Sequence, residues 1–163
     1  PRTSSAASDV YKRQDLNDII NMAISHLSLI VESKNGKISF DNEAENTQIV
    51  GNETHLINVF VNILDNAAKY NNNRPQILIK TKNINDKVIV DIEDNGIGMT
   101  KSVQSKIFDK FYRKQTGDVH DVKGHGLGLA YVKKIIDFHN GNINVESTLG
   151  KGSVFSIQLG LFK

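Results

Sequence analysis

The sequence has no cysteine, no tryptophan and only two prolines among its 163 residues. Without cysteine there is no disulfide, no thiolate zinc site and no cysteine nucleophile, which suits a reducing compartment. The longest apolar runs fall far below the ~18 residues that a membrane span needs. We therefore expect a cytoplasmic domain whose own residues make no membrane contact, and leave open an anchor elsewhere in the parent protein.

The sequence also lacks a large excess of either sign of charge. The formal net charge is +2, and basic and acidic residues are interspersed along the chain. This balance predicts no nucleic-acid surface. The length and apolar content suit one domain with its own core. Residues 1–14 are polar and lack periodicity, so we expect a disordered or artefactual lead-in there and a folded domain over residues 15–163.

Hydrophobic periodicity predicts alternating helices and strands. Since most of the strands are joined as hairpins, the expected class is α+β: a two-layer sandwich whose mixed, mostly antiparallel sheet is covered on one face by about three helices. The expected helices are Asp15–Glu32, the helix within Asn52–Asn73, Lys101–Phe108 and Leu127–His139. The expected strands are Lys37–Phe40, Thr47–Val50, Gln76–Thr81, Lys87–Glu93, Asn142–Ser147 and Ser153–Leu159.

The helix within Asn52–Asn73 carries two different stripes. One is apolar and has the spacing of a core-facing helix. The other gathers amides and charges, although asparagine is a poor helix former because its short amide competes for the backbone. Helix propensity does not account for the second stripe, so we expect it to be functional. The apolar stripe is Leu56, Val59, Phe60, Ile63, Leu64 and Ala67, and the polar stripe is Asn58, Asn62, Asp65, Asn66 and Lys69.

Asp94 continues the core-facing row of Val88, Val90 and Ile92 at the end of a predicted strand. A carboxylate in such a row is costly unless a donor meets it. Two interpretations stay open. Asp94 is a cap for the turn at Asn95-Gly96, or it lies at the floor of a pocket and accepts a hydrogen bond from a ligand amine.

Glycines punctuate the chain at two further places. Gly96 and Gly98 flank Ile97, which allows either a simple turn or close approach of the backbone to a ligand. The segment Gly124–Leu129 precedes a predicted helix, where free N–H groups favour phosphate. Its GxGxG spacing is not the Rossmann fingerprint, and no P-loop motif occurs. A flexible start of the helix is the alternative interpretation.

The motifs follow a recognisable order. An NxxxN…KY helix (Asn62, Asn66, Lys69-Tyr70) is followed by DNGIG, an FxxF segment (Phe108, Phe111), GxGLGL and GKGSxF. Over about Asp15 to Leu159 the chain resembles the ATP-binding catalytic domain of bacterial sensor histidine kinases, in the GHKL or Bergerat-fold superfamily. The resemblance implies that fold, with a mobile lid over ATP at residues 114–125.

The resemblance also implies roles for the base and metal contacts. Asp94 would accept a hydrogen bond from the adenine amine, and Tyr70 would line the base. Asn66 would bind Mg²⁺ through its amide oxygen, a hard ligand that suits this ion. The pocket would be framed by Gly96, Ile97, Gly98, Gly124, Gly126, Leu127, Gly128 and Leu129.

Three residues would act on the triphosphate. Asn62 would lie near the phosphates, Lys69 would contact them, and Arg113 would meet the γ-phosphate. Hydrolysing members of the superfamily carry a glutamate at the position of Asn62, as general base for water. An amide cannot take that proton, so the resemblance favours phosphoryl transfer over hydrolysis.

No H-[DE]-x-[RK]-x-P segment is present, so the phosphoacceptor histidine would lie on a separate dimerisation domain of the same parent protein. The expected function is the catalytic part of a two-component sensor histidine kinase, with a response regulator downstream. Two alternatives stay open: a serine kinase of the anti-sigma type, and a nucleotide-binding regulatory module without turnover.

Overall fold

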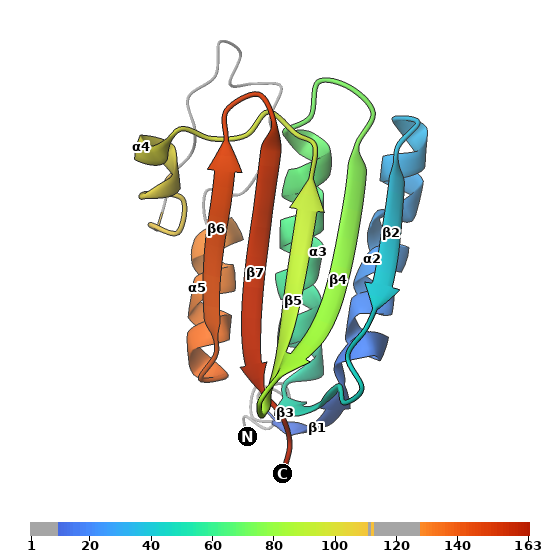
Figure 1. Ribbon diagram of the computed structural model, residues 1–163, viewed down its shortest axis with the longest axis vertical. Helices are drawn as coiled ribbons and strands as arrows, with labels where there is room; N and C mark the ends of the chain where they lie inside the picture. The colour runs from blue at the N-terminus through green and yellow to red at the C-terminus, as the bar shows by residue number, and fades with distance from the viewer. Residues whose placement is uncertain (1–9, 111, 113–127) are drawn as a thin grey trace, which may run out of the picture.

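The computed structural model describes residues 10–110, 112 and 128–163, which form a sheet backed by helices (Figure 1). The main sheet has five strands in the order β2-β4-β5-β7-β6. Its strands are β2 (Lys37–Asn42), β4 (Gln76–Ile84), β5 (Lys87–Asp94), β6 (Asn142–Thr148) and β7 (Gly152–Gly160). β2 pairs with β4 in parallel and the other three pairings are antiparallel. The predicted mixed, mostly antiparallel sheet is confirmed.

Three long helices cover one face of this sheet: α2 (Leu16–Ser33), α3 (Glu53–Lys69) and α5 (Gly128–Phe138). A fourth, short helix, α4 (Lys101–Gln104), lies beside the end of β6 where that strand finishes (Figure 1). The predicted two-layer α+β class is confirmed. No helix within the described residues is long and apolar enough to cross a membrane.

Local signals fix the helix ends. Asp15 caps α2 by accepting a hydrogen bond from the Asn17 N–H at 2.9 Å, and Asn52 caps α3 by accepting one from the His55 N–H at 3.0 Å. Beyond α2 and α5 the chain turns at asparagines in the left-handed region, Asn35 with φ 59° and Asn140 with φ 56°. These stops are the Asn-Gly pairs that the sequence shows.

The core lies between the helices and one face of the sheet. Val88, Val90 and Ile92 alternate along β5 and are each 0% exposed, as the period of a strand requires. From α3, Phe60 and Leu64 meet them from the other layer and are also 0% exposed. The apolar stripe predicted for this helix is therefore buried.

The structure differs from the sequence-based expectations in two places. Lys12 to Gln14 were placed in a lead-in, but Lys12–Asp15 form strand β1, which pairs antiparallel with β3 (Gln48–Gly51). β1 is polar and short, so its pairing has no periodic signal. The helix expected at Lys101–Phe108 ends at Gln104, and turns carry the chain to the buried Ile107.

Candidate functional site

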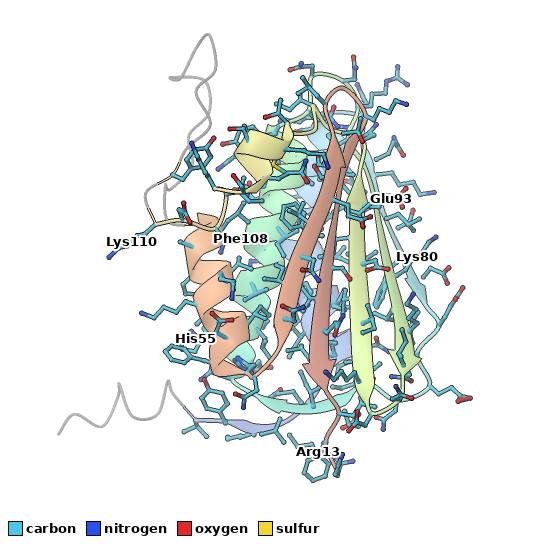
Figure 2. All side chains as sticks on the ribbon, turned by 60° about the vertical axis from the view of Figure 1, so that its left-hand side comes forward. Arg13, His55, Lys80, Glu93, Phe108 and Lys110 are labelled. Atoms are coloured by element: carbon cyan, nitrogen blue, oxygen red, sulfur yellow. The ribbon has the colours of Figure 1, made fainter. Side chains whose placement is uncertain are left out.

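The candidate residues gather at one end of the molecule. The C-terminal end of α3, the end of β5, the β6–β7 turn and α4 all lie at the top of the view in Figure 1. Figure 2 places Phe108 and Lys110 on the α4 side, and Arg13 at the opposite end. Phe108 packs edge-on against Phe155 of β7, with 6.4 Å between ring centroids, and so anchors the segment that follows α4.

The polar stripe of α3 runs along the helix to its C-terminal end. Asn62, Asn66 and Lys69 are spaced at i, i+4 and i+7, share one side of the helix and are half-buried. The Lys69 ammonium forms an ion pair with Asp65 at 2.8 Å. The Asn62 amide nitrogen donates to the Asn58 carbonyl oxygen at 2.7 Å. The stripe therefore presents amide and ammonium groups at a partly open surface.

α5 begins next to this stripe. A Cβ atom built at Gly128, the first residue of α5, would lie 3.3 Å from Oδ1 of Asn62. Leu129 follows and packs against the core while staying half-exposed. Glycine thus lets the first turn of α5 approach the Asn62 amide of α3 closely.

Asp94 ends β5 and is half-buried. Burial raises the pKa of its carboxyl group, while the backbone N–H groups of Gly96 and Ser153 oppose that rise. Oδ1 accepts a hydrogen bond from the Gly96 N–H at 2.8 Å. The turn-cap interpretation is thus confirmed, and a partly desolvated carboxyl group at the edge of a site remains suited to a ligand donor.

Residues 95–100, called here the glycine loop, connect β5 to α4. The Ile97 N–H donates to the Tyr70 carbonyl oxygen at 2.9 Å, which ties the loop to the end of α3. A Cβ atom built at Gly96 would lie 2.5 Å from the same oxygen, and one at Gly98, with φ 70°, would collide with the Thr148 carbonyl oxygen. Both positions therefore require glycine.

A hollow of about 270 Å³ opens beside the glycine loop. It is lined by Asn71–Asn73, by Asn95–Ile97 and by Leu149 and Gly150. The Asn71 amide donates to the Asn95 side-chain oxygen at 2.7 Å, and that oxygen also accepts from the Gln76 N–H at 2.8 Å. Sequence reasoning took the asparagine run only as the close of a helix and missed that it fixes the glycine loop.

Several predicted site residues lie outside the described part of the chain. They are Phe111, Arg113, Gly124, Gly126, Leu127 and the lid at residues 114–125. Within the described part, no group of three or more His, Asp or Glu side chains could hold a metal ion.

Comparison with known proteins decides the family. Residues 51–162 match the family model described as histidine kinase-, DNA gyrase B- and HSP90-like ATPase. The chain belongs to this ATPase family. The match runs from the last residue of β3 to just beyond β7, and it includes α3, the glycine loop and α5.

Relatives of this ATPase domain include sensor kinases. The sensor protein RprX of Bacteroides fragilis is 47% identical over 154 residues, covering 93% of this chain and 30% of the relative. The sensor histidine kinase RppB of Synechocystis is 32% identical over 147 residues, covering 90% and 32%. The chain is thus homologous to sensor histidine kinases and spans about 30% of the length of these relatives.

Solved structures agree on the fold. A nucleotide-free catalytic domain of histidine kinase ThkA superposes with a TM-score of 0.79 at 25% identity, covering 93% of this chain and 95% of that one. ThkA in complex with the response regulator TrrA matches with a TM-score of 0.76 at 23% identity, covering 93% and 42%. The ATPase domain described here has the fold of a histidine kinase catalytic domain.

Proposed function

We propose that this chain is the Mg·ATP-dependent catalytic domain of a two-component sensor histidine kinase, which donates the γ-phosphate of ATP to a histidine on a separate dimerisation domain of the same parent protein. One observation carries the proposal. The 2.9 Å hydrogen bond from the Ile97 N–H to the Tyr70 carbonyl oxygen joins the glycine loop, which follows Asp94, to the end of the helix that carries Asn62, Asn66 and Lys69.

The described residues fit an adenine nucleotide. Asp94 offers a partly desolvated carboxyl group beside Gly96, where a side chain would collide with the Tyr70 carbonyl oxygen. This arrangement supports a role for Asp94 as acceptor for the adenine amine, with the glycine loop against the base. A hydrogen bond to a buried carboxyl group distinguishes ligands that have a donor from ligands that lack one, because a buried carboxyl group without its donor is costly.

The phosphate end of the nucleotide would lie along α3 towards the start of α5. Lys69 would exchange part of its ion pair with Asp65 for phosphate oxygens. Asn66 would hold Mg²⁺ through its amide oxygen. The ion, when bound, would neutralise phosphate charge and orient the γ-phosphate. The first turn of α5 at Gly128 would add backbone N–H donors.

Asn62 supports transfer to a protein over hydrolysis. Its amide nitrogen is held by the Asn58 carbonyl oxygen at 2.7 Å, and its oxygen lies beside Gly128. An amide has no basic pair with which to take a proton from water. Such a site positions the nucleotide and stabilises its charge, but it does not activate a nucleophile. The acceptor protein must therefore supply both the attacking atom and the base that activates it.

The relatives support the partners proposed for the reaction. Sensor kinases that match this chain are about three times as long, which leaves room for a dimerisation domain with a phosphoacceptor histidine. The ThkA–TrrA complex supports a response regulator as the downstream partner. A membrane anchor would likewise belong to the parent protein.

The test is phosphotransfer in solution. The domain is mixed with a cognate dimerisation domain and labelled ATP, with and without Mg²⁺. We expect acid-labile phosphohistidine on the acceptor only with Mg²⁺, and none when the acceptor histidine is replaced by alanine. Acid-stable phosphoserine on the partner would instead identify an anti-sigma type serine kinase. Nucleotide binding without transfer to any acceptor would identify a regulatory module.

A further inference from the structure

The glycine loop is held from two sides. On one side its Ile97 N–H donates to the carbonyl oxygen of Tyr70, the residue that caps the C-terminus of α3, at 2.9 Å. On the other side the β6–β7 hairpin holds it: the Gly150 N–H donates to the Ile97 carbonyl oxygen at 2.7 Å, and the Met99 N–H donates to Ser147 Oγ at 2.8 Å. Irregular backbone needs such partners, because unpaired buried groups are costly.

Gln104, the last residue of α4, completes the hold of the hairpin. Its half-buried side-chain amide donates one hydrogen bond to the Met99 carbonyl oxygen at 3.1 Å and another to the Ser147 carbonyl oxygen at 3.0 Å. Both amide hydrogens are thereby used. A single side chain bridges the end of the glycine loop and a strand 43 residues further along the chain.

The bridge extends to the strand opposite Asp94. The Ser147 hydroxyl donates to the Gly152 carbonyl oxygen at 2.9 Å and also lies 2.8 Å from the Ser153 hydroxyl. Ser153 pairs with Asp94 in the register of β5 and β7. Gln104 and Ser147 are thus connected to both ends of the segment that runs from Asp94 to Met99.

We propose that Gln104 and Ser147 are positioning residues for nucleotide binding, which hold the glycine loop in its base-binding shape by fixing both backbone polar groups of Met99. The proposal rests on the function proposed above, since it requires that the base bind at Asp94. A loop that is fixed beforehand loses less conformational freedom when the ligand binds, and affinity gains accordingly.

The decisive variant is Gln104→Glu. Glutamate has the same shape, but its ionised carboxylate has no donor and sets oxygens against the carbonyl oxygens of Met99 and Ser147. We expect calorimetry, well below the melting temperature, to show affinities for ATP, ADP and AMP that all fall by on the order of tenfold. The preference for ATP over GTP should narrow as well, because the base contact is the one disturbed.

Matched variants separate positioning from general damage. Gln158→Glu makes the same change on β7, near its far end, and should leave nucleotide affinity unchanged. Ser147→Ala should weaken binding about as much as Gln104→Glu, whereas Ser147→Thr keeps the hydroxyl and should retain affinity. The double variant Gln104→Glu/Ser147→Ala should show a fold-loss of nucleotide affinity smaller than the product of the two single fold-losses, because both residues act through Met99.

Two results would overturn the proposal: a folded Gln104→Glu domain with unchanged affinity for all three nucleotides, or a loss confined to ATP while AMP binds normally. If Gln104→Glu does not fold, Gln104→Met keeps the length without the donors and is judged by the same criteria. A wild-type domain that binds no adenine nucleotide would overturn the proposed function too, so wild-type binding distinguishes the two failures.

Discussion

The end of the domain that contains β1, β3 and the C-terminal residues is closed by contacts within the protein, whereas the opposite end presents polar side chains beside the glycine loop. Each end has a half-buried titratable group, His139 and Asp94 respectively. His139 Nε2 accepts from the Asn52 N–H at 3.1 Å, and Nδ1 donates to the Ile135 carbonyl oxygen at 2.7 Å. Both nitrogens of the neutral ring are therefore used.

Burial shifts the pKa values of these two groups in opposite directions. It lowers the pKa of His139 and raises the pKa of Asp94, because in each case burial penalises the charged form relative to water. For His139 the neutral form is also the one that its partners require. The ring of Tyr11 packs against it at a tilt of 40°, with centroids 5.0 Å apart. The Asp94 carboxyl group accepts hydrogen bonds from the backbone N–H groups of Gly96, in its own loop, and of Ser153 in β7. The first arrangement serves stability, and the second suits a ligand.

The largest expected effect is on the open end. Asp94→Ala should lower ATP affinity roughly 10- to 150-fold, since a hydrogen bond to a charged group contributes about 1.5–3 kcal/mol. Calorimetry measures this directly. The matched control is Asp91→Ala, on the same strand but on the opposite face of the sheet, which should leave affinity unchanged. Equal affinities for a folded Asp94→Ala variant and wild type would refute the adenine assignment.

A substitution at the closed end, where His139 lies, should lower the stability of the protein and leave nucleotide binding unchanged. His139→Phe keeps an aromatic ring but leaves the Asn52 N–H without its acceptor, so we expect the free energy of unfolding to fall by about 2 kcal/mol. Urea denaturation gives that value, and ATP affinity of the folded variant should not change. His26→Phe, on the exposed side of α2, is the control. A large change in ATP affinity would contradict the separation of the two ends.

Asn66→Ala tests the amide stripe of α3. On the proposed role of Asn66 as a Mg²⁺ ligand, its loss should reduce the enhancement of ATP affinity by Mg²⁺ by about tenfold, with little effect on ATP binding without Mg²⁺. The comparison is made by titrating ATP with Mg²⁺ and with a chelator. Asn58→Ala removes an exposed amide of the same helix and should retain the full enhancement. A normal response to Mg²⁺ in Asn66→Ala would remove that residue from the metal site.

The smallest effect is a pH dependence. Folding lowers the pKa of His139. As the pH falls through about 6.5, this histidine is therefore protonated in the unfolded chain before it is protonated in the folded protein. The free energy of unfolding should therefore decrease by up to about 1 kcal/mol between pH 7 and pH 5.5. Asp94, whose pKa is raised, acts in the opposite sense at lower pH. His139→Phe should remove this slope, and an unchanged slope would assign it to other groups.

Much of the fold was predictable because its signals are local. The stripe that includes Leu56 and Phe60, the cap at Asn52 and the stop at Asn140 each depend on residues within a turn or two. The roles proposed for residues on α3 and β5 came from the order of the motifs and stay predictions. The bridge from Gln104 to Ser147 had no such signal, since nothing near Gln104 in sequence identifies its partner.

Strand pairings likewise divide into those with a local sequence signal and those without one. The β4–β5 hairpin was evident from two alternating runs across a short turn. β1 was not, because four polar residues acquire a strand conformation only by hydrogen bonding to β3, some 35 residues away. The parallel alignment of β2 with β4 is likewise set by the passage of the chain through β3 and α3 between them.

By itself the sequence determined the helices, the hairpins, the class of the fold and the chemical types at the candidate site, because periodicity, caps and turns act between near neighbours. Only the tertiary structure decided that Asn95 is tied to Asn71 and Gln76, that Gln104 reaches Ser147, and that His139 closes the other end. Those contacts depend on burial and on partners far apart in the chain, and a linear pattern does not contain them.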